Sequence, residues 1–168
     1  MNKNHPERKP TRLRGYDYSQ QNAYFVTVCT QERSEILADI SRGGALLLPI
    51  GKIVEEEIRN LPKKYDVSVD KYVIMPNHIH MIVLMRGKDS VHSLSDVLCA
   101  LKSRTTQMAN ELDGTTGRQI WQRSFHDHII RDEKDYLKIW QYIDENPMRW
   151  EWDCFYRSVT QTEAEQDI

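Results

Sequence analysis

Two apolar runs at the centre of the chain, residues 67–75 and 79–85, are joined by a short segment that begins with Pro76-Asn77. Short apolar runs separated by turn-forming residues are typical of the two strands of a β-hairpin. A hairpin in the middle of a chain restricts the possible folds, because the segments on both sides of it must pack against the same two strands. The elements before and after it therefore decide the fold class.

The flanking segments show strand and helix patterns in alternation. Runs with strand character cover residues 23–30 and 120–131. Apolar residues at helical spacing predict helices over 49–61, 93–112 and 132–145. The order strand, helix, strand, strand, helix, strand, helix predicts an α+β protein: a ferredoxin-like split βαβ fold with a central antiparallel sheet and an extra C-terminal helix.

Local signals predict where several of these elements end. Pro62 is expected to end the first helix and Pro147 the last. Ser93 or Ser95 is expected to cap the second helix, because a serine hydroxyl can accept a hydrogen bond from a free amide of the first turn. The sequence Ser41-Arg42-Gly43-Gly44 indicates a turn.

The 168 residues favour a single domain with a hydrophobic core of ordinary size. No apolar stretch approaches the roughly 20 residues that a membrane span requires, and the N-terminus lacks the apolar core of a secretory signal. Three widely spaced cysteines are expected to be reduced, buried thiols of a cytosolic protein. They are Cys29, Cys99 and Cys154.

The net charge of −2 is distributed unevenly along the chain. A basic N-terminal arm is expected over residues 1–18, a single domain over 19–156, and a polar, acidic and disordered tail over 157–168. The arm could bind phosphates or could be solvated, and charge alone does not distinguish these two interpretations.

The sequence PNHIHMIV places His78 and His80 inside an apolar strand. Residues two apart in a strand project from the same face, so both imidazoles should lie on one side and Ile79, Met81 and Val83 on the core side. Two imidazoles at this spacing can bind one metal ion, although a pair of hydrogen-bonded structural histidines is equally compatible with the pattern. His126 and His128 form a second pair at the same spacing, which could bind a competing metal, contact phosphates or be structural.

The last predicted helix carries Tyr142 and Asn146 four residues apart, on one helical face. A tyrosine hydroxyl can act as a nucleophile, and an asparagine oxygen can bind a hard cation. Packing of the tyrosine and a helix stop at the asparagine are the structural alternatives. Tyr136 is a less favourable nucleophile, because its neighbour one turn later is Trp140 and its face is therefore expected to pack.

Together these motifs resemble those of a known family. YFVTVCTQER, VIMPNHIHMIV, LKSRTT, WQRSFHDHIIRDEKDY and QYIDENP occur in the order found in the HUH single-tyrosine transposases, and the chain is most similar to the REP-associated tyrosine transposases. The resemblance covers most of residues 12–150. Longer HUH enzymes, such as replication initiators or relaxases, usually carry additional domains.

The resemblance implies an enzyme that cuts and rejoins single-stranded DNA beside a short hairpin. His78 and His80 would hold a magnesium or manganese ion with Asn146 as the third ligand, a position where relatives often have glutamine. Tyr142 would become joined to a 5′ phosphate and leave a free 3′-OH. A DNA-binding protein that keeps the fold without the chemistry is the alternative, and both monomers and homodimers occur among relatives.

Basic and histidine side chains outside this site are the candidates for DNA contacts. They are Arg12, Arg14, Lys102, Arg104, Arg123, His126, His128 and Arg131.

Overall fold

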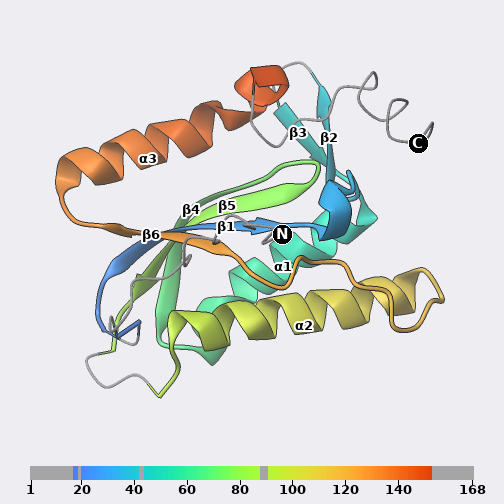
Figure 1. The fold of residues 1–168 in the computed structure, drawn as a ribbon, viewed down its shortest axis with the longest axis horizontal. Helices are drawn as coiled ribbons and strands as arrows, with labels where there is room; N and C mark the ends of the chain where they lie inside the picture. The colour runs from blue at the N-terminus through green and yellow to red at the C-terminus, as the bar shows by residue number, and fades with distance from the viewer. Residues whose placement is uncertain (1–16, 19, 42–43, 88–90, 153–168) are drawn as a thin grey trace, which may run out of the picture.

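The computed structural model describes residues 17–18, 20–41, 44–87 and 91–152, which contain a four-stranded antiparallel sheet (Figure 1). The strands lie in the order β4-β5-β1-β6. Their bounds are β1 Ala23–Cys29, β4 Val67–Ile74, β5 His78–Met85 and β6 His126–Ile130. The predicted central hairpin is therefore present as β4 and β5.

Helices cover both faces of the sheet. On one face lie α1, Pro49–Lys64, and α2, Leu94–Leu112, while α3, Glu133–Glu145, lies across the other face (Figure 1). Ser93 caps α2 in a capping box with Asp96, which confirms one of the two predicted capping residues. The strand order and the helix positions confirm the predicted ferredoxin-like fold with an extra C-terminal helix.

The alternation of β5 places its side chains in two different environments. Ile79, Met81 and Val83 lie in the main core between the sheet and α1 and α2, as predicted. Ile82 belongs to a smaller core on the opposite face, which contains Ile143 of α3. His78 and His80 have the same parity as Ile82 and therefore face α3.

Polar contacts to β4 complement this small core and hold α3 against the sheet. The Tyr136 hydroxyl donates a hydrogen bond to Asp70, and Lys71 forms an ion pair of 2.5 Å with Asp144. The Lys71 ammonium also lies 3.8 Å from the ring centroid of Trp140. Tyr136 thus has the packing role that its neighbours in the sequence predicted.

The prediction that Pro62 ends the first helix is wrong, because α1 continues to Lys64. Pro62 has no amide to donate to the Ile58 carbonyl, but the residues after it can still donate within the final turn. The amide of Tyr65 still donates to the Leu61 carbonyl at 3.0 Å and closes that turn.

The prediction of one continuous strand over residues 120–131 is also wrong. Thr27 of β1 pairs with His126, whereas Thr30 forms an isolated bridge with Trp121. Four residues, 122–125, lie between these contacts on one side and two, 28–29, on the other, so the chain bulges there. Phe125 in the bulge is buried in the main core, which explains why the segment leaves the strand pairing.

Short elements that were not predicted lie near the end of β1. They are η1 Gln31–Arg33, β2 Ala38–Ser41, β3 Gly44–Leu47 and η2 Asn146–Trp152. The predicted turn begins at the last residue of β2 and ends at the first of β3, and its two central residues lie outside the described residues. The last helix ends before Pro147, as expected, but the chain continues as the 3-10 helix η2.

Other sequence predictions concern the ends of the chain and the cysteines. The basic arm to residue 16 and the acidic tail lie outside the described residues, as does Cys154. Cys29 is buried as expected, but Cys99 is exposed because it lies on the outer face of α2. Among the described residues, no helix is long and apolar enough to span a membrane.

Candidate active site

His80 is held between a strand neighbour and the last helix. β1 pairs with β5 so that Thr27 lies opposite His80, and a hydrogen bond of 2.8 Å joins Thr27 Oγ1 to His80 Nδ1. The other ring nitrogen, Nε2, lies 3.2 Å from the Tyr142 hydroxyl. The sheet register therefore fixes the orientation of an imidazole that reaches the predicted nucleophile.

His78 is positioned by the residue before it. Its Nδ1 donates a hydrogen bond of 2.9 Å to Asn77 Oδ1. Because an amide oxygen only accepts, the hydrogen is on Nδ1 and the lone pair is on Nε2, which is buried. The two imidazole rings are 4.4 Å apart between centroids, so the strand brings together the pair that the sequence predicted.

The surroundings of His78 favour a neutral ring. Burial, with a smaller contribution from the positive charge of Arg33, lowers the pKa of His78 from 6.5 to about 3. A neutral imidazole with its lone pair on Nε2 is the form that binds a metal, and Asn77 is the kind of partner that orients a ligating histidine.

Tyr142 reaches the histidines from its own chain. Asp132 caps the first turn of α3 by accepting from the Asp135 amide, and the helix then carries Tyr142 over β1 and β5. The Tyr142 ring lies 5.2 Å from the His80 ring and 6.0 Å from the Phe25 ring, between centroids. Tyr142 is 39% exposed, so part of the residue is open to solvent or a substrate.

Asn146 lies one turn after Tyr142, at the junction of α3 and η2, and is only 3% exposed. Trp150 of η2 packs on His78 with ring centroids 5.9 Å apart. Tyr142, which precedes Asn146 in the sequence, thus contacts His80, and Trp150, which follows it, contacts His78. Within the described residues, no group of three or more His, Cys, Asp or Glu side chains lies close enough together to hold a metal ion.

Sequence reasoning missed three residues of this site. Thr27 and Asn77 hydrogen-bond the two imidazoles, and the Asn77 role could have been expected from its place beside His78. Arg33 belongs to η1, where both Glu32 and Arg33 have positive φ angles of 56° and 53°. Such angles are uncommon for residues other than glycine, and no glycine marks this turn in the sequence.

The second histidine pair lies on β6, on the far side of β1 from His78 and His80. His126 lies opposite Thr27 and His128 opposite Phe25. Both histidines are on the same face of the sheet as Tyr142. His126 is two strand spacings, or about 10 Å, from His80. His128 pairs with Asp135 of α3 at 2.7 Å, which lowers the pKa of that carboxyl. Asp127 faces the opposite side of the sheet, because it is paired with the core residue Val26.

The basic candidates have different surroundings. Lys102 donates to the carbonyls of Gln122 and Arg123, and Arg104 forms an ion pair with Glu57 of α1. Both residues therefore contribute to the structure around α2. Arg123 and Arg131 are exposed.

The remaining basic candidates, Arg12 and Arg14, lie outside the described residues. A DNA contact stays a prediction for every basic and histidine candidate.

Comparison with known families identifies the family of the chain. Residues 18–146 match the family described as IS200-like transposases, which is most of the chain and includes both histidines, Tyr142 and Asn146. The chain belongs to the IS200-like transposase family. This IS200-like transposase is therefore expected to be a DNA-cleaving and DNA-joining enzyme, and the family resemblance inferred from its motifs is confirmed.

Two relatives and one solved structure are similar to this chain. An uncharacterised protein of Haemophilus influenzae is 30% identical over 89% of this chain and 93% of its own length. A REP-associated tyrosine transposase of Escherichia coli is 25% identical over 71% of this chain and 73% of its own. A solved REP-associated tyrosine transposase, bound to a REP hairpin, has the same fold, with a TM-score of 0.63 and 23% identity over 84% of this chain and 75% of that one.

The low pKa of His78 predicts an acid-sensitive fold. The folded protein keeps the ring neutral down to about pH 3, whereas the unfolded chain takes up a proton near pH 6.5. The unfolded state therefore binds the extra proton between these values, and the free energy of unfolding should fall by up to about 1.4 kcal/mol per pH unit below pH 6.5. Urea unfolding of wild type and His78→Gln at pH 4.5–7.5, without metal, measures this: the variant should lose the additional slope. Equal slopes in both proteins would contradict the assignment.

Proposed function

We propose that this transposase is a metal-dependent single-stranded DNA endonuclease and strand transferase that acts beside DNA hairpins through a 5′-phosphotyrosine intermediate. The observation that carries the proposal is the 3.2 Å contact between the Tyr142 hydroxyl and His80, made within one chain beside a second buried histidine. A solvent-accessible tyrosine over an imidazole pair suits attack on a bound phosphate.

The proposed reaction exchanges one phosphodiester bond for another. The Tyr142 Oη–P bond forms while the P–O3′ bond breaks, the phenolic proton is lost, and the departing 3′ oxygen gains a proton. Tyr142 then carries the 5′ phosphate, and a 3′-OH can reverse the attack to rejoin strands. Since the covalent link retains the energy of the original bond, joining needs no nucleoside triphosphate.

The donor set fits a divalent metal ion. His78 presents Nε2, His80 presents the nitrogen that lies beside Tyr142, and Asn146 supplies a buried amide oxygen, so these three residues would hold the ion. When bound, magnesium or manganese would polarise the phosphate and neutralise developing negative charge. The two nitrogen ligands favour manganese somewhat, because magnesium prefers oxygen.

Arg33 is proposed to neutralise the scissile phosphate. A guanidinium close enough to lower the pKa of His78 would repel a metal cation at the same place. A phosphate between the two positive charges removes this repulsion and uses both for charge stabilisation. His126, exposed on the same face, is proposed to contact the DNA backbone farther along the strand.

The proposed DNA partner follows from the relatives. One solved relative is a REP-associated tyrosine transposase bound to a REP hairpin, so an imperfect palindrome with single-stranded flanks is the substrate class proposed here. Tyr142 reaches His80 in cis, so the chemistry would not require a second subunit, although a homodimer stays a prediction.

A covalent-adduct assay tests the proposal. The full chain is incubated with single-stranded DNA that contains a hairpin and is labelled on either side of the cleavage site, in the presence of manganese. The expected products are a protein–DNA adduct that survives denaturation and a released strand with a free 3′-OH. Hairpin binding without cleavage under these conditions would instead support the non-catalytic alternative.

A further inference from the structure

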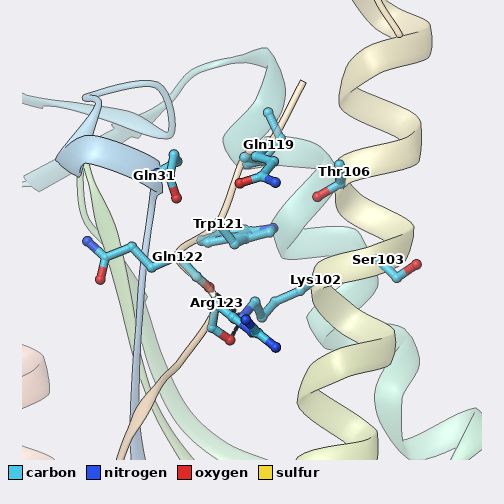
Figure 2. A pocket seen from close by; sticks show the side chains of 9 residues that line it. Gln31, Lys102, Ser103, Thr106, Gln119, Trp121, Gln122 and Arg123 are labelled. Carbon is cyan, nitrogen blue, oxygen red and sulfur yellow. Dashed lines mark hydrogen bonds between the residues drawn. The ribbon is translucent and has the colours of Figure 1, made fainter. Parts of the chain in front are cut away.

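A pocket with several polar side chains in its lining lies between α2 and the bulged segment before β6 (Figure 2). The helix α2 is on the opposite face of the sheet from α3 (Figure 1). It has a volume of about 720 Å³, within the range of sites that bind small molecules or single nucleotides. Ile120 and Trp121 are buried at its floor, while Ser103, Gln119 and Arg123 are exposed at its rim.

Hydrogen bonds within the protein make the pocket walls rigid. Lys102 donates to the carbonyls of Gln122 and Arg123 at 2.5 and 2.9 Å, which ties the bulge to α2 (Figure 2). The Trp121 indole donates to Thr105 Oγ1 at 2.8 Å, so the ring is fixed in place. A pocket that is already formed loses little conformational entropy when a ligand binds.

The chemistry of the lining suits a nucleotide. Gln31 and Gln119 have side-chain amides, and Ser103 and Thr106 have hydroxyls. Each of these groups can both donate and accept hydrogen bonds, as the edge of a nucleotide base requires. Lys102 and Arg123 lie together at one end of the pocket in Figure 2. Among the nine lining residues, all within the described part of the chain, none is acidic, so the lining favours an anionic ligand.

The pocket is close to the candidate active site along the chain. Cys29 pairs with His78 in the sheet, and Gln31, two residues later, lines the pocket. The Gln31 amide donates to the Ile120 carbonyl at 2.8 Å, which joins η1 to the pocket floor. η1 thus has Gln31 at the pocket and Arg33 near His78, so a DNA strand bound at His78 could continue over η1 into the pocket.

We propose that this pocket binds an unpaired nucleotide of the DNA substrate. Gln31, Gln119 and Thr106 would hydrogen-bond the base, and Arg123 would bind its phosphate. Lys102 shapes the site by holding the bulge. The inference rests on the proposed function, because it takes single-stranded DNA as the substrate, and it adds a second recognition site outside the catalytic one.

Binding measurements can separate this pocket from catalysis. All variants carry Tyr142→Phe and are tested in chelator, so neither nucleophile nor metal contributes. The probes are a fluorescent DNA hairpin with single-stranded flanks and the same hairpin without them. Thr106→Trp fills the pocket, and Gln107→Trp, on the exposed side of the same helix turn, is the matched control.

The expected result is at least a tenfold loss of affinity for the flanked hairpin in Thr106→Trp only, with unchanged affinity for the hairpin without flanks. Equal binding of the flanked DNA by both tryptophan variants would overturn the proposal. If Thr106→Trp does not fold, as judged by circular dichroism, the Arg123→Gln variant provides the test instead. It should lower the slope of log affinity against log salt by about 1 for flanked DNA only, and an unchanged slope would overturn the proposal.

These results are independent of the adduct assay. If filling the pocket does not change DNA affinity, but proteins that retain Tyr142 form the adduct, the pocket proposal is wrong and the proposed reaction is supported. If no adduct forms, but filling the pocket lowers affinity for flanked DNA only, the proposed reaction is wrong and the pocket proposal is supported.

Discussion

Replacement of Tyr142 by phenylalanine should abolish the covalent protein–DNA adduct and lower strand cleavage by more than about a thousandfold, as expected when a nucleophile is removed. The substitution deletes one hydroxyl and keeps the ring that packs near Phe25 and His80. Hairpin affinity and the free energy of unfolding should therefore change little. Gel analysis of denatured reactions and a titration of labelled hairpin measure the two effects separately.

Tyr136→Phe is the matched control, because Tyr136 lies on the same helix and also has a polar partner. Its hydrogen bond to Asp70 raises the pKa of Tyr136 to about 12, which makes it a poorer nucleophile near neutral pH. Loss of this bond should cost about 1 kcal/mol of stability and leave adduct formation intact. An adduct formed by Tyr142→Phe, or lost in Tyr136→Phe, would contradict the assignment.

Replacement of either buried histidine by alanine should remove metal-dependent cleavage. Loss of a residue that merely orients a metal ligand lowers metal affinity about 10- to 100-fold, so loss of a direct ligand should cost at least about a hundredfold. His78→Ala and His80→Ala should therefore both weaken manganese binding, measured by calorimetry in the absence of DNA. Cleavage should fall in parallel and should also disappear in wild type when a chelator removes the ion.

His126→Ala provides the control for these two variants. His126 lies on the same face of the sheet, in the same row as His80, but is exposed and about 10 Å away. Its substitution should leave manganese affinity unchanged and affect only DNA binding. Manganese binding by His78→Ala or His80→Ala at the wild-type affinity would contradict the proposed ligand set.

The sequence was sufficient to predict features that depend on periodicity. The alternation of apolar and histidine residues along β5 correctly predicted Ile79 and Met81 on the core side and His78 and His80 on the other side. The four-residue spacing of Tyr142 and Asn146 predicted a shared helical side, and in the structure Asn146 follows directly after the last residue of α3. Such patterns survive folding because backbone geometry alone sets which side chains share a face.

Features that depend on register or on local backbone conformation were not predictable in this way. Thr27 meets His80 only because β1 and β5 pair in one particular register. The left-handed turn at Glu32 and Arg33 carries no glycine, so no local signal marked it. Likewise, a basic residue on a helix such as Arg104 cannot be distinguished from a DNA contact until its ion pair with Glu57 is seen.

The most direct test of the account is the identity of the residue that becomes joined to DNA. Trypsin should cut the adduct after Lys134, Lys138 and Arg149, which separates Tyr136 and Tyr142 into different peptides. After nuclease trimming, mass spectrometry should find a 5′-linked nucleotide on the peptide of residues 139–149, which contains Tyr142. A nucleotide on the peptide of residues 135–138, or on any residue other than Tyr142, would contradict the account.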